Sequence, residues 1–158
     1  MRRDVTKFGA NPGNANNAQY IQAAINDLKR TGGTVVIPAG TYYTGTLELF
    51  SQITLCLDAG AVLKGTADIQ DYPAVGLEQN EFGPVHALLF AHDAENVGLT
   101  GDGIIDFNGD HFFDFEQPFN PGIDMTALSQ EQRMEVDVKP KERPNQLIYF
   151  KRCRGGQC

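Results

Sequence analysis

Carboxylates and a histidine are concentrated in residues 102–116 of the sequence. The segment contains His111 and five acidic residues, Asp102, Asp106, Asp110, Asp114 and Glu116. Two carboxylates with an imidazole could act as general acid and base, and carboxylate oxygens also bind calcium. A spacing of four residues would align several of them on a helix, but Gly103 and Gly109 disfavour a helix there. We therefore interpret the cluster as a solvated turn and loop edge, with no catalytic residue, metal site or cofactor predicted.

The remaining histidines and the cysteines do not predict a metal site either. His86 and His92 bracket the strand-like run 87–91, and they share one face of a strand but lie too far apart to bind one metal ion. We interpret both as ordinary surface histidines. The three cysteines include no CxxC pair, so neither a zinc site nor a disulfide framework is predicted.

The composition is that of a globular chain, with 158 residues of which 41% are hydrophobic and 21% charged. A net charge of −7 argues against binding to nucleic acid, whose phosphates attract basic proteins. The longest apolar run, residues 87–91, is far shorter than the roughly 20 residues of a membrane span. Arg2 and Arg3 are not followed by the apolar segment of an export signal. We therefore expect a cytoplasmic protein that contacts no membrane.

One amphipathic helix is predicted near the N-terminus. Four apolar residues recur at helical spacing and form one stripe, namely Ile21, Ala24, Ile25 and Leu28. Asn16 or Asn17 can serve as the N-cap, and Gly32 ends the helix. The pattern predicts a helical cap over about residues 16–31.

Short strands joined by turns follow from residue 34 onward. Three strand–turn–strand units recur, with strands at 34–37 and 41–44, at 53–57 and 61–64, and at 97–100 and 104–107. Their turn glycines, Gly40, Gly60 and Gly103, are 20 and 43 residues apart. We interpret the longer separation as two steps, with the skipped step near residues 87–90. A period of about 20 residues is typical of a solenoid.

The sequence therefore predicts an all-β fold, a right-handed parallel β-helix in a single domain. The rungs are expected over about residues 34–109, followed by a loop excursion over about 110–146, with a short helix in 127–134, and a further strand over about 147–153. The helix would cover the exposed edge of the first rung. A β-sandwich is the alternative, although it would favour tight Asn-Gly hairpins. Inward-facing residues are predicted to include Val36, Leu55, Leu57, Leu63 and Leu99.

Six runs of the sequence follow one another in the order known from one family. The runs are Phe8–Ala10, Gly32–Tyr42, Leu55–Gly65, Asp71–Pro73, Asn96–Asp106 and Arg143–Phe150. Together they resemble the N-terminal part of the pectin-lyase-like superfamily and, within it, glycoside hydrolase family 28, the polygalacturonases. Two positions depart from the family pattern: Phe107 replaces a glycine, and Phe112–Phe113 replace two tryptophans.

The resemblance implies a glycoside hydrolase that cleaves α-galacturonide bonds of pectin or oligogalacturonides with inversion. Inversion requires a carboxylic acid and a carboxylate about 6.5–9.5 Å apart. The family carries them in an Asn-Thr-Asp motif and an Asp-Asp pair, supported by Gly-His-Gly and Arg-x-Lys, and none of these motifs occurs here. We therefore expect this chain alone to be inactive. The alternatives are a non-catalytic β-helix module that binds polysaccharide or self-associates, and β-elimination of the pectate lyase type.

Four residues of the excursion are our candidates for binding a pectic poly- or oligosaccharide. Arg143 could pair bidentately with a substrate carboxylate, although a structural ion pair with Glu142 or a neighbouring acid is the favoured alternative. Phe112 and Phe113 could stack on a sugar ring beside His111, or could form an apolar cluster under the loop.

The sequence pattern changes after Cys153. Family members continue with Asn-Val and further rungs, whereas Gly155 and Gly156 stand here where we expect an apolar strand to start. We therefore expect a truncated chain whose final residues are not native to the fold. Its uncapped C-terminal end would expose strand edges and favour self-association.

Overall fold

The computed structural model describes residues 1–80, 83–118, 120, 122–136, 138–140 and 144–155. Within these ranges, the side chains of residues 77–80, 113–117 and 138–140 are not described. The chain forms two compact units, one of Met1–Phe107 together with Pro144–Cys158 and one of Asn108–Arg143. No helix in the described ranges is long and apolar enough to cross a membrane.

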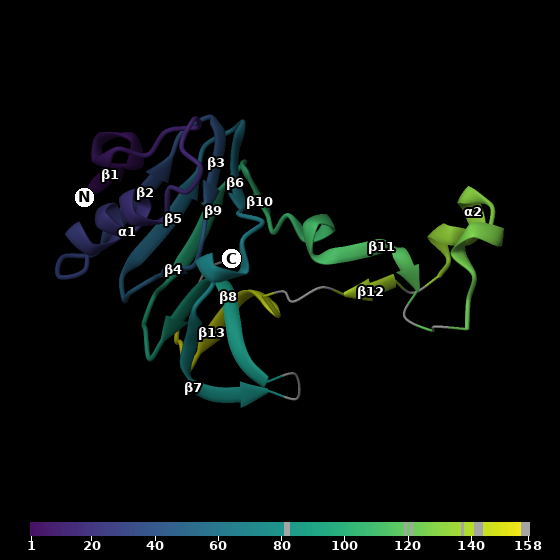
Figure 1. Ribbon diagram of the computed structural model, residues 1–158. Coiled ribbons are helices and arrows are strands. Elements are labelled where there is room, and N and C mark those ends of the chain that lie inside the picture. The colour runs from purple at the N-terminus through teal and green to yellow at the C-terminus, as the bar shows by residue number, and fades with distance from the viewer. Residues whose placement is uncertain (81–82, 119, 121, 137, 141–143, 156–158) are drawn as a thin grey trace. The chain divides into compact units, whose positions relative to one another are not determined.

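Three parallel sheets form the first unit (Figure 1). Sheet A consists, in spatial order, of β1 (Arg2–Asp4), β2 (Gly33–Ile37), β5 (Ile53–Leu57) and β9 (Gly98–Gly101). Sheet B consists of β3 (Gly40–Thr44), β6 (Ala61–Gly65) and β10 (Ile104–Asp106). Sheet C consists of β4 (Leu47–Glu48), β8 (Gly83–His92) and β13 (Gln146–Lys151). Three parallel sheets, to which the successive turns of the chain add strands, confirm the predicted parallel β-helix and contradict a β-sandwich.

Each turn of the β-helix places one strand in each sheet. The first complete turn is β2-β3-β4, the second is β5-β6-β8 and the third is β9-β10-β13. The second turn is longer because it also contains the 3-10 helix η2 (Ile69–Asp71) and strand β7 (Ala74–Asn80), which pairs antiparallel with β8. The prediction of a skipped step near residues 87–90 is therefore wrong, since that segment is the third side of the second turn.

The core lies between the sheets, where side chains of equal register stack along the axis. The stacked sets are Val35, Leu55 and Leu99 in sheet A, Tyr42, Leu63 and Ile105 in sheet B, and Leu47, Leu89 and Ile148 in sheet C. Leu55, Leu57 and Leu63 are buried, as predicted. Leu99, in the third turn, is half-buried.

One residue predicted to face inward lies on the other face of its strand. Val36 pairs in register with Cys56, whereas Val35 pairs with Leu55. Because successive side chains of a strand alternate between its faces, Val36 lies on the outer face of sheet A. It is nevertheless 3% exposed, because the 3-10 helix η1 (Val5–Phe8) packs against β2. The inward placement of Val36 was wrong because the sequence does not distinguish burial in the core from burial under a neighbouring element.

Helix α1 (Ala18–Asp27) covers the free edge of the first turn, as predicted, but is shorter than the expected 16–31. Its apolar stripe is fully buried. The Gln22 side chain donates a hydrogen bond to the Glu48 carbonyl (3.0 Å) and accepts one from the Glu48 N–H (2.9 Å). These two bonds satisfy backbone groups of β4, the edge strand of sheet C as the structure describes it.

The second unit contains short elements of its own. They are η3 (Gly109–Phe112), β11 (Phe113–Pro118), η4 (Met125–Ala127), α2 (Gln130–Met134) and β12 (Val138–Pro140). Strands β11 and β12 pair antiparallel. Helix α2, inside the region where a short helix was predicted, begins with a capping box between Ser129 and Gln132. The segment predicted as a loop excursion thus has regular secondary structure.

Candidate functional site

The outer face of sheet C gathers aromatic and ionisable side chains. Leu89 and Ala91 of β8 point into the core and are fully buried, so Phe90 and His92 between and after them point outward. In register, Tyr149 of β13 lies beside Phe90, and Lys151 lies beside His92. On the other side of β8, Glu48 of β4 also pairs with Phe90. The parallel register thus aligns Glu48, Phe90 and Tyr149 side by side across three turns of the β-helix.

The aromatic rings on this face contact one another and an apolar cluster. The His92 ring lies edge-on to both Phe90 and Tyr149, with centroid distances of 5.4 Å and 5.9 Å. Phe90 and Tyr149 also pack against the small cluster of Val75, Val85 and Ala87. Packing of this kind holds the rings in fixed orientations while leaving them partly exposed.

Strands β8 and β13 are each followed by a short connecting turn, residues 93–96 and 152–155, and these two connecting turns have the same backbone shape. Asp93 and Arg152 hold the first position with φ of 50° and 51°, and Asn96 and Gly155 hold the last with φ of 53° and 64°. Backbone hydrogen bonds join the two turns, from Asp93 to Lys151, from Arg154 to Ala94 and from Asn96 to Arg154. The left-handed conformation at Gly155 suits glycine. Gly155 therefore continues the turn, and the expectation that it stands at the start of a strand is wrong.

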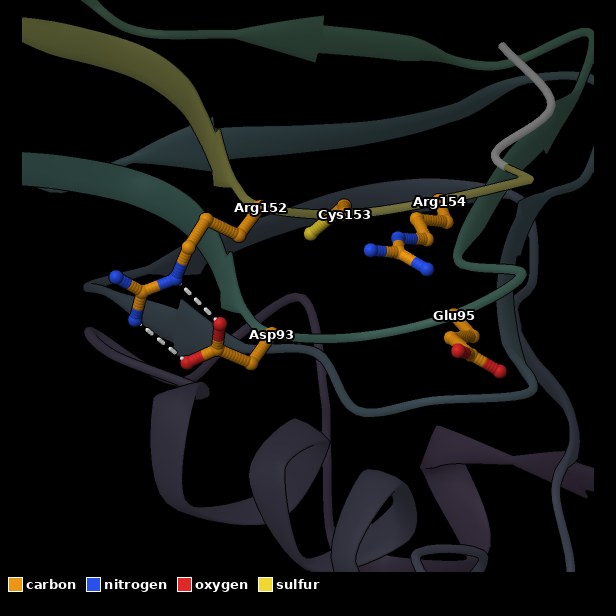
Figure 2. A pocket seen from close by; sticks show the side chains of 5 residues that line it. All are labelled: Asp93, Glu95, Arg152, Cys153 and Arg154. Atoms are coloured by element: carbon orange, nitrogen blue, oxygen red, sulfur yellow. Dashed lines mark hydrogen bonds and ion pairs between the residues drawn. The ribbon is translucent and has the colours of Figure 1, made fainter.

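The two turns line a cavity of about 530 Å³ with the side chains of Asp93, Glu95, Arg152, Cys153 and Arg154 (Figure 2). Arg152 donates two hydrogen bonds to the Asp93 carboxylate, from Nε at 2.5 Å and from Nη2 at 2.8 Å. The hydrogen bond from Arg152 lowers the pKa of Asp93 below its usual value, and the same bond raises the pKa of Arg152. Both groups therefore remain charged at neutral pH.

The cavity offers hydrogen-bond donors and acceptors together with the free thiol of Cys153. Arg152 and Asp93 neutralise each other, and Glu95 and Arg154 add one further charge of each sign. A small polar ligand rich in hydroxyl groups or carrying a carboxylate suits such a lining. Among the residues that the structure describes, no three potential ligands are grouped to hold a metal ion.

The four residues predicted to bind substrate all lie in the second unit. His111 is exposed in η3, and the neighbouring Phe112 is buried, with 3% of its surface exposed. Phe113 begins β11, and its side chain is outside the described residues, as is Arg143 altogether. Substrate binding by these four residues stays a prediction.

Sequence reasoning missed the ring cluster on sheet C. His86 and His92 were predicted to be ordinary surface histidines, and this was wrong for both. His86 is half-buried, with its Nδ1 2.7 Å from the Tyr72 carbonyl. His92 Nε2 is buried and, within the described part of the chain, has no hydrogen-bond partner. The alternation of Phe90 and His92 with buried residues is a signal that they share one outer face. The sequence did not indicate that β13 would bring Tyr149 beside them.

Comparison with known proteins places the chain in a family. Residues 2–148 match the family described as rhamnogalacturonase A/epimerase, pectate lyase-like. An exo-poly-α-D-galacturonosidase of Dickeya chrysanthemi is 37% identical over 117 residues, which are 67% of this chain and 19% of that protein. This chain thus aligns with about a fifth of the length of that relative.

Two solved structures have the same fold. A family 28 exopolygalacturonase of Yersinia enterocolitica matches 99% of this chain and 33% of its own, with 26% identity and a TM-score of 0.69. A hyperthermoactive exopolygalacturonase of Thermotoga maritima matches 99% of this chain and 40% of its own, with 24% identity and a TM-score of 0.70. Because the family match covers residues 2–148 and the chain folds into three parallel sheets, this chain belongs to the rhamnogalacturonase A/epimerase, pectate lyase-like family.

Proposed function

We propose that this chain is part of a polygalacturonase-type glycoside hydrolase that cleaves α-galacturonide bonds of pectic poly- or oligosaccharides. The observation that carries the proposal is the family match over residues 2–148, together with the 37% identity to a bacterial exo-poly-α-D-galacturonosidase. The outer face of sheet C adds a structural argument to this similarity.

The outer face of sheet C suits an acidic sugar chain. Phe90 and Tyr149 offer partly exposed rings against which a pyranose ring can stack. Lys151 and Arg154 follow along the same strand and turn, and each adds a cation for a uronate carboxylate. These local cations matter because the chain as a whole carries a net charge of −7.

In this proposal the chain contributes binding, and the hydrolytic step requires groups beyond it. Inversion needs one carboxylic acid to protonate the leaving oxygen and a second carboxylate to activate water from the opposite face. The family's Asn-Thr-Asp and Asp-Asp motifs do not occur in the sequence. We therefore infer that the chain alone binds oligogalacturonides without hydrolysing them.

Titration with trigalacturonate tests the binding surface. Calorimetry and chemical-shift mapping are expected to detect binding at β8 and β13, with no galacturonate released. Tyr149→Ala is expected to weaken binding by about two- to tenfold, since an aromatic contact contributes about 0.5–1.5 kcal/mol. Tyr43→Ala, on β3 of sheet B, is the matched control and is expected to leave the affinity unchanged. Equal effects of the two substitutions would contradict the proposed surface.

The same titration tests the four candidates of the second unit. Arg143→Ala is expected to weaken binding if the guanidinium pairs with a substrate carboxylate. Unchanged binding together with a lower melting temperature would indicate the ion pair with Glu142 instead. Substitution of His111, Phe112 or Phe113 by alanine is expected to weaken binding if that side chain contacts the sugar. Unchanged binding together with a lower melting temperature would indicate a structural role for that side chain.

A non-catalytic polysaccharide-binding module is the second candidate, favoured by the absence of the hydrolase motifs from this sequence. The nucleotide sequence beyond codon 154 distinguishes these two candidates from each other and from β-elimination. A frame that continues with further β-helix turns, Asn-Thr-Asp and Asp-Asp supports the hydrolase. A frame that encodes calcium ligands and a basic residue instead supports β-elimination, and one with neither set supports the binding module.

A further inference from the structure

The His92 ring has a polar atom in an apolar setting. It lies edge-on between Phe90 and Tyr149, with interplanar angles of 64° and 80°. Its Nε2 atom is buried and has no hydrogen-bond partner among the residues that the structure describes. Buried polar atoms are nearly always paired, so this nitrogen calls for an explanation.

A bulge of β7 closes over the edge of this ring. The register of β7 on β8 shifts between Ala74 and Gln79, and Gly76 within this bulge has φ of 74°. A Cβ atom at Gly76 would lie 2.8 Å from His92 Cε1 and 3.5 Å from Nε2. The backbone at Gly76 therefore stands against the ring edge that carries the unpaired nitrogen, and only glycine allows this approach.

Protonation of His92 changes the hydrogen bonds and the charge that its surroundings must accommodate. A neutral imidazole can leave one nitrogen as an unused acceptor, whereas an imidazolium has two N–H donors and a positive charge. A buried, unpaired charge is far more costly than an unpaired neutral atom. The charged ring is therefore stable only if Nε2 reaches water, and the bulge of β7 blocks that path.

Of the two described charges next to His92, one repels an imidazolium and the other attracts it but is already paired. Lys151, its register partner on β13, carries the same charge as an imidazolium. The neighbouring Asp93 carboxylate attracts an imidazolium, but it already accepts two hydrogen bonds from Arg152. Tyr149 contributes its ring, and Ala74, Val75 and Gly76 of β7 carry no charge. The one carboxylate of β7 is Glu78, whose side chain is outside the described residues.

We propose that the β7 bulge is an acid-released latch: protonation of His92 expels its ring from the site between Phe90, Tyr149 and Gly76 and frees β7 from the outer face of sheet C. The other end of the hairpin stays in place. There His86 has its Nδ1 2.7 Å from the Tyr72 carbonyl, and its N–H donates to the Asn145 side chain at 3.0 Å. Binding of any sugar plays no part in this proposal.

Amide hydrogen exchange at about pH 8 and about pH 5.5, on either side of the ordinary histidine pKa, tests the latch. After correction for the intrinsic rates, the amides of β7 are expected to lose about tenfold or more of their protection at the lower pH. The amides of β5, in sheet A, serve as the internal reference and are expected to keep theirs. Equal protection of β7 at both pH values would overturn the proposal.

Substitution of His92, one of the three histidines of the chain, tests whether it is the sensor. His92→Phe keeps an aromatic ring and removes the titrating group, so β7 is expected to stay protected at both pH values. His111→Phe is the matched control and is expected to retain the acid response. An acid response that persists in His92→Phe would overturn the proposal.

Two further measurements keep the proposal testable if His92→Phe does not fold. In the unaltered chain, nitrogen NMR of the imidazoles is expected to give a His92 titration whose midpoint coincides with the loss of β7 protection. Different midpoints would overturn the proposal. Glu78→Gln is expected to retain the acid response, and loss of the response would identify the carboxylate as the sensor instead.

Discussion

Tyr72 shows how a single residue can fasten the insertion of the second turn to the β-helix. Its side chain is 1% exposed, and its hydroxyl donates a hydrogen bond of 2.7 Å to the Thr66 carbonyl. The ring also lies edge-on to Phe107, at a centroid distance of 6.1 Å. The Tyr72 carbonyl in turn lies within hydrogen-bonding distance of the His86 ring. One residue thus joins the segment before β7 to three other parts of the fold.

We predict that Tyr72 makes the protein sensitive to alkali. Burial raises the pKa of its phenol from 10.0 to about 12. The folded state favours the neutral phenol, so this contribution to stability is complete below about pH 10 and is lost as the pH rises toward 12. Tyr72→Phe is expected to lower the unfolding free energy by about 1 kcal/mol at neutral pH and to flatten its alkaline decline.

Urea denaturation at a series of pH values checks this prediction. Tyr43→Phe, which changes an exposed tyrosine on β3, is the control and is expected to leave the alkaline decline unchanged. An equally steep decline in Tyr72→Phe and in the unaltered chain would contradict the prediction.

At the scale of elements, stacking of strands leaves no room for a side chain at Gly101. This residue ends β9 with φ of 100°, and a Cβ atom there would collide with the backbone carbonyl of Leu57 on β5. Gly83 at the start of β8 has the same φ, but no atom of the described residues lies within 4 Å of such a Cβ. The two glycines therefore separate the cost of the backbone conformation from the cost of the close approach.

We expect Gly83→Ala to destabilise the chain by the strain of its conformation alone, about 1–3 kcal/mol. Gly101→Ala is expected to cost clearly more, because β9 must also move away from β5. Thermal unfolding followed by circular dichroism measures both variants under the same conditions. Equal losses of stability would show that the stack of sheet A accommodates a methyl group at this position.

At the scale of the whole molecule, the third turn exposes part of the core that the first two turns bury. Leu47 and Leu89 of sheet C are fully buried, whereas Ile148, the next residue in the same stack, is 37% exposed. Leu99 is likewise more exposed than Leu55 below it in sheet A. Exposed apolar side chains beside unpaired strand edges favour association with another chain.

We predict that this chain self-associates through the face formed by its third turn. Ile148→Glu is expected to shift the equilibrium toward the monomer, because it places a charge where apolar contact would occur. Ile104→Glu adds the same charge on the outer face of sheet B in the same turn and is the control. Sedimentation velocity over a wide range of concentrations measures both. A chain that stays monomeric at all concentrations would contradict the prediction.

The sequence by itself determined the repeating strands and their parallel stacking. Residues 33–65 were predictable because apolar residues alternate on short strands, and glycines mark the turns at Gly40 and Gly60. The capping helix was predictable from its apolar stripe, and the family from the order of its motifs. These features are local in sequence, and each rests on the side-chain pattern of one strand or helix.

Only the tertiary structure decided which side of the β-helix each later strand occupies. The separation between Gly60 and Gly103 fits both an additional turn and an insertion, and the antiparallel pairing of β7 with β8 is what distinguishes them. The same holds for Val36, whose burial comes from a neighbouring helix. The environment of His92 likewise depends on Tyr149, which is 57 residues away in sequence. Contacts between distant residues depend on strand register and on the path of insertions, and neither leaves a periodic signal in the sequence.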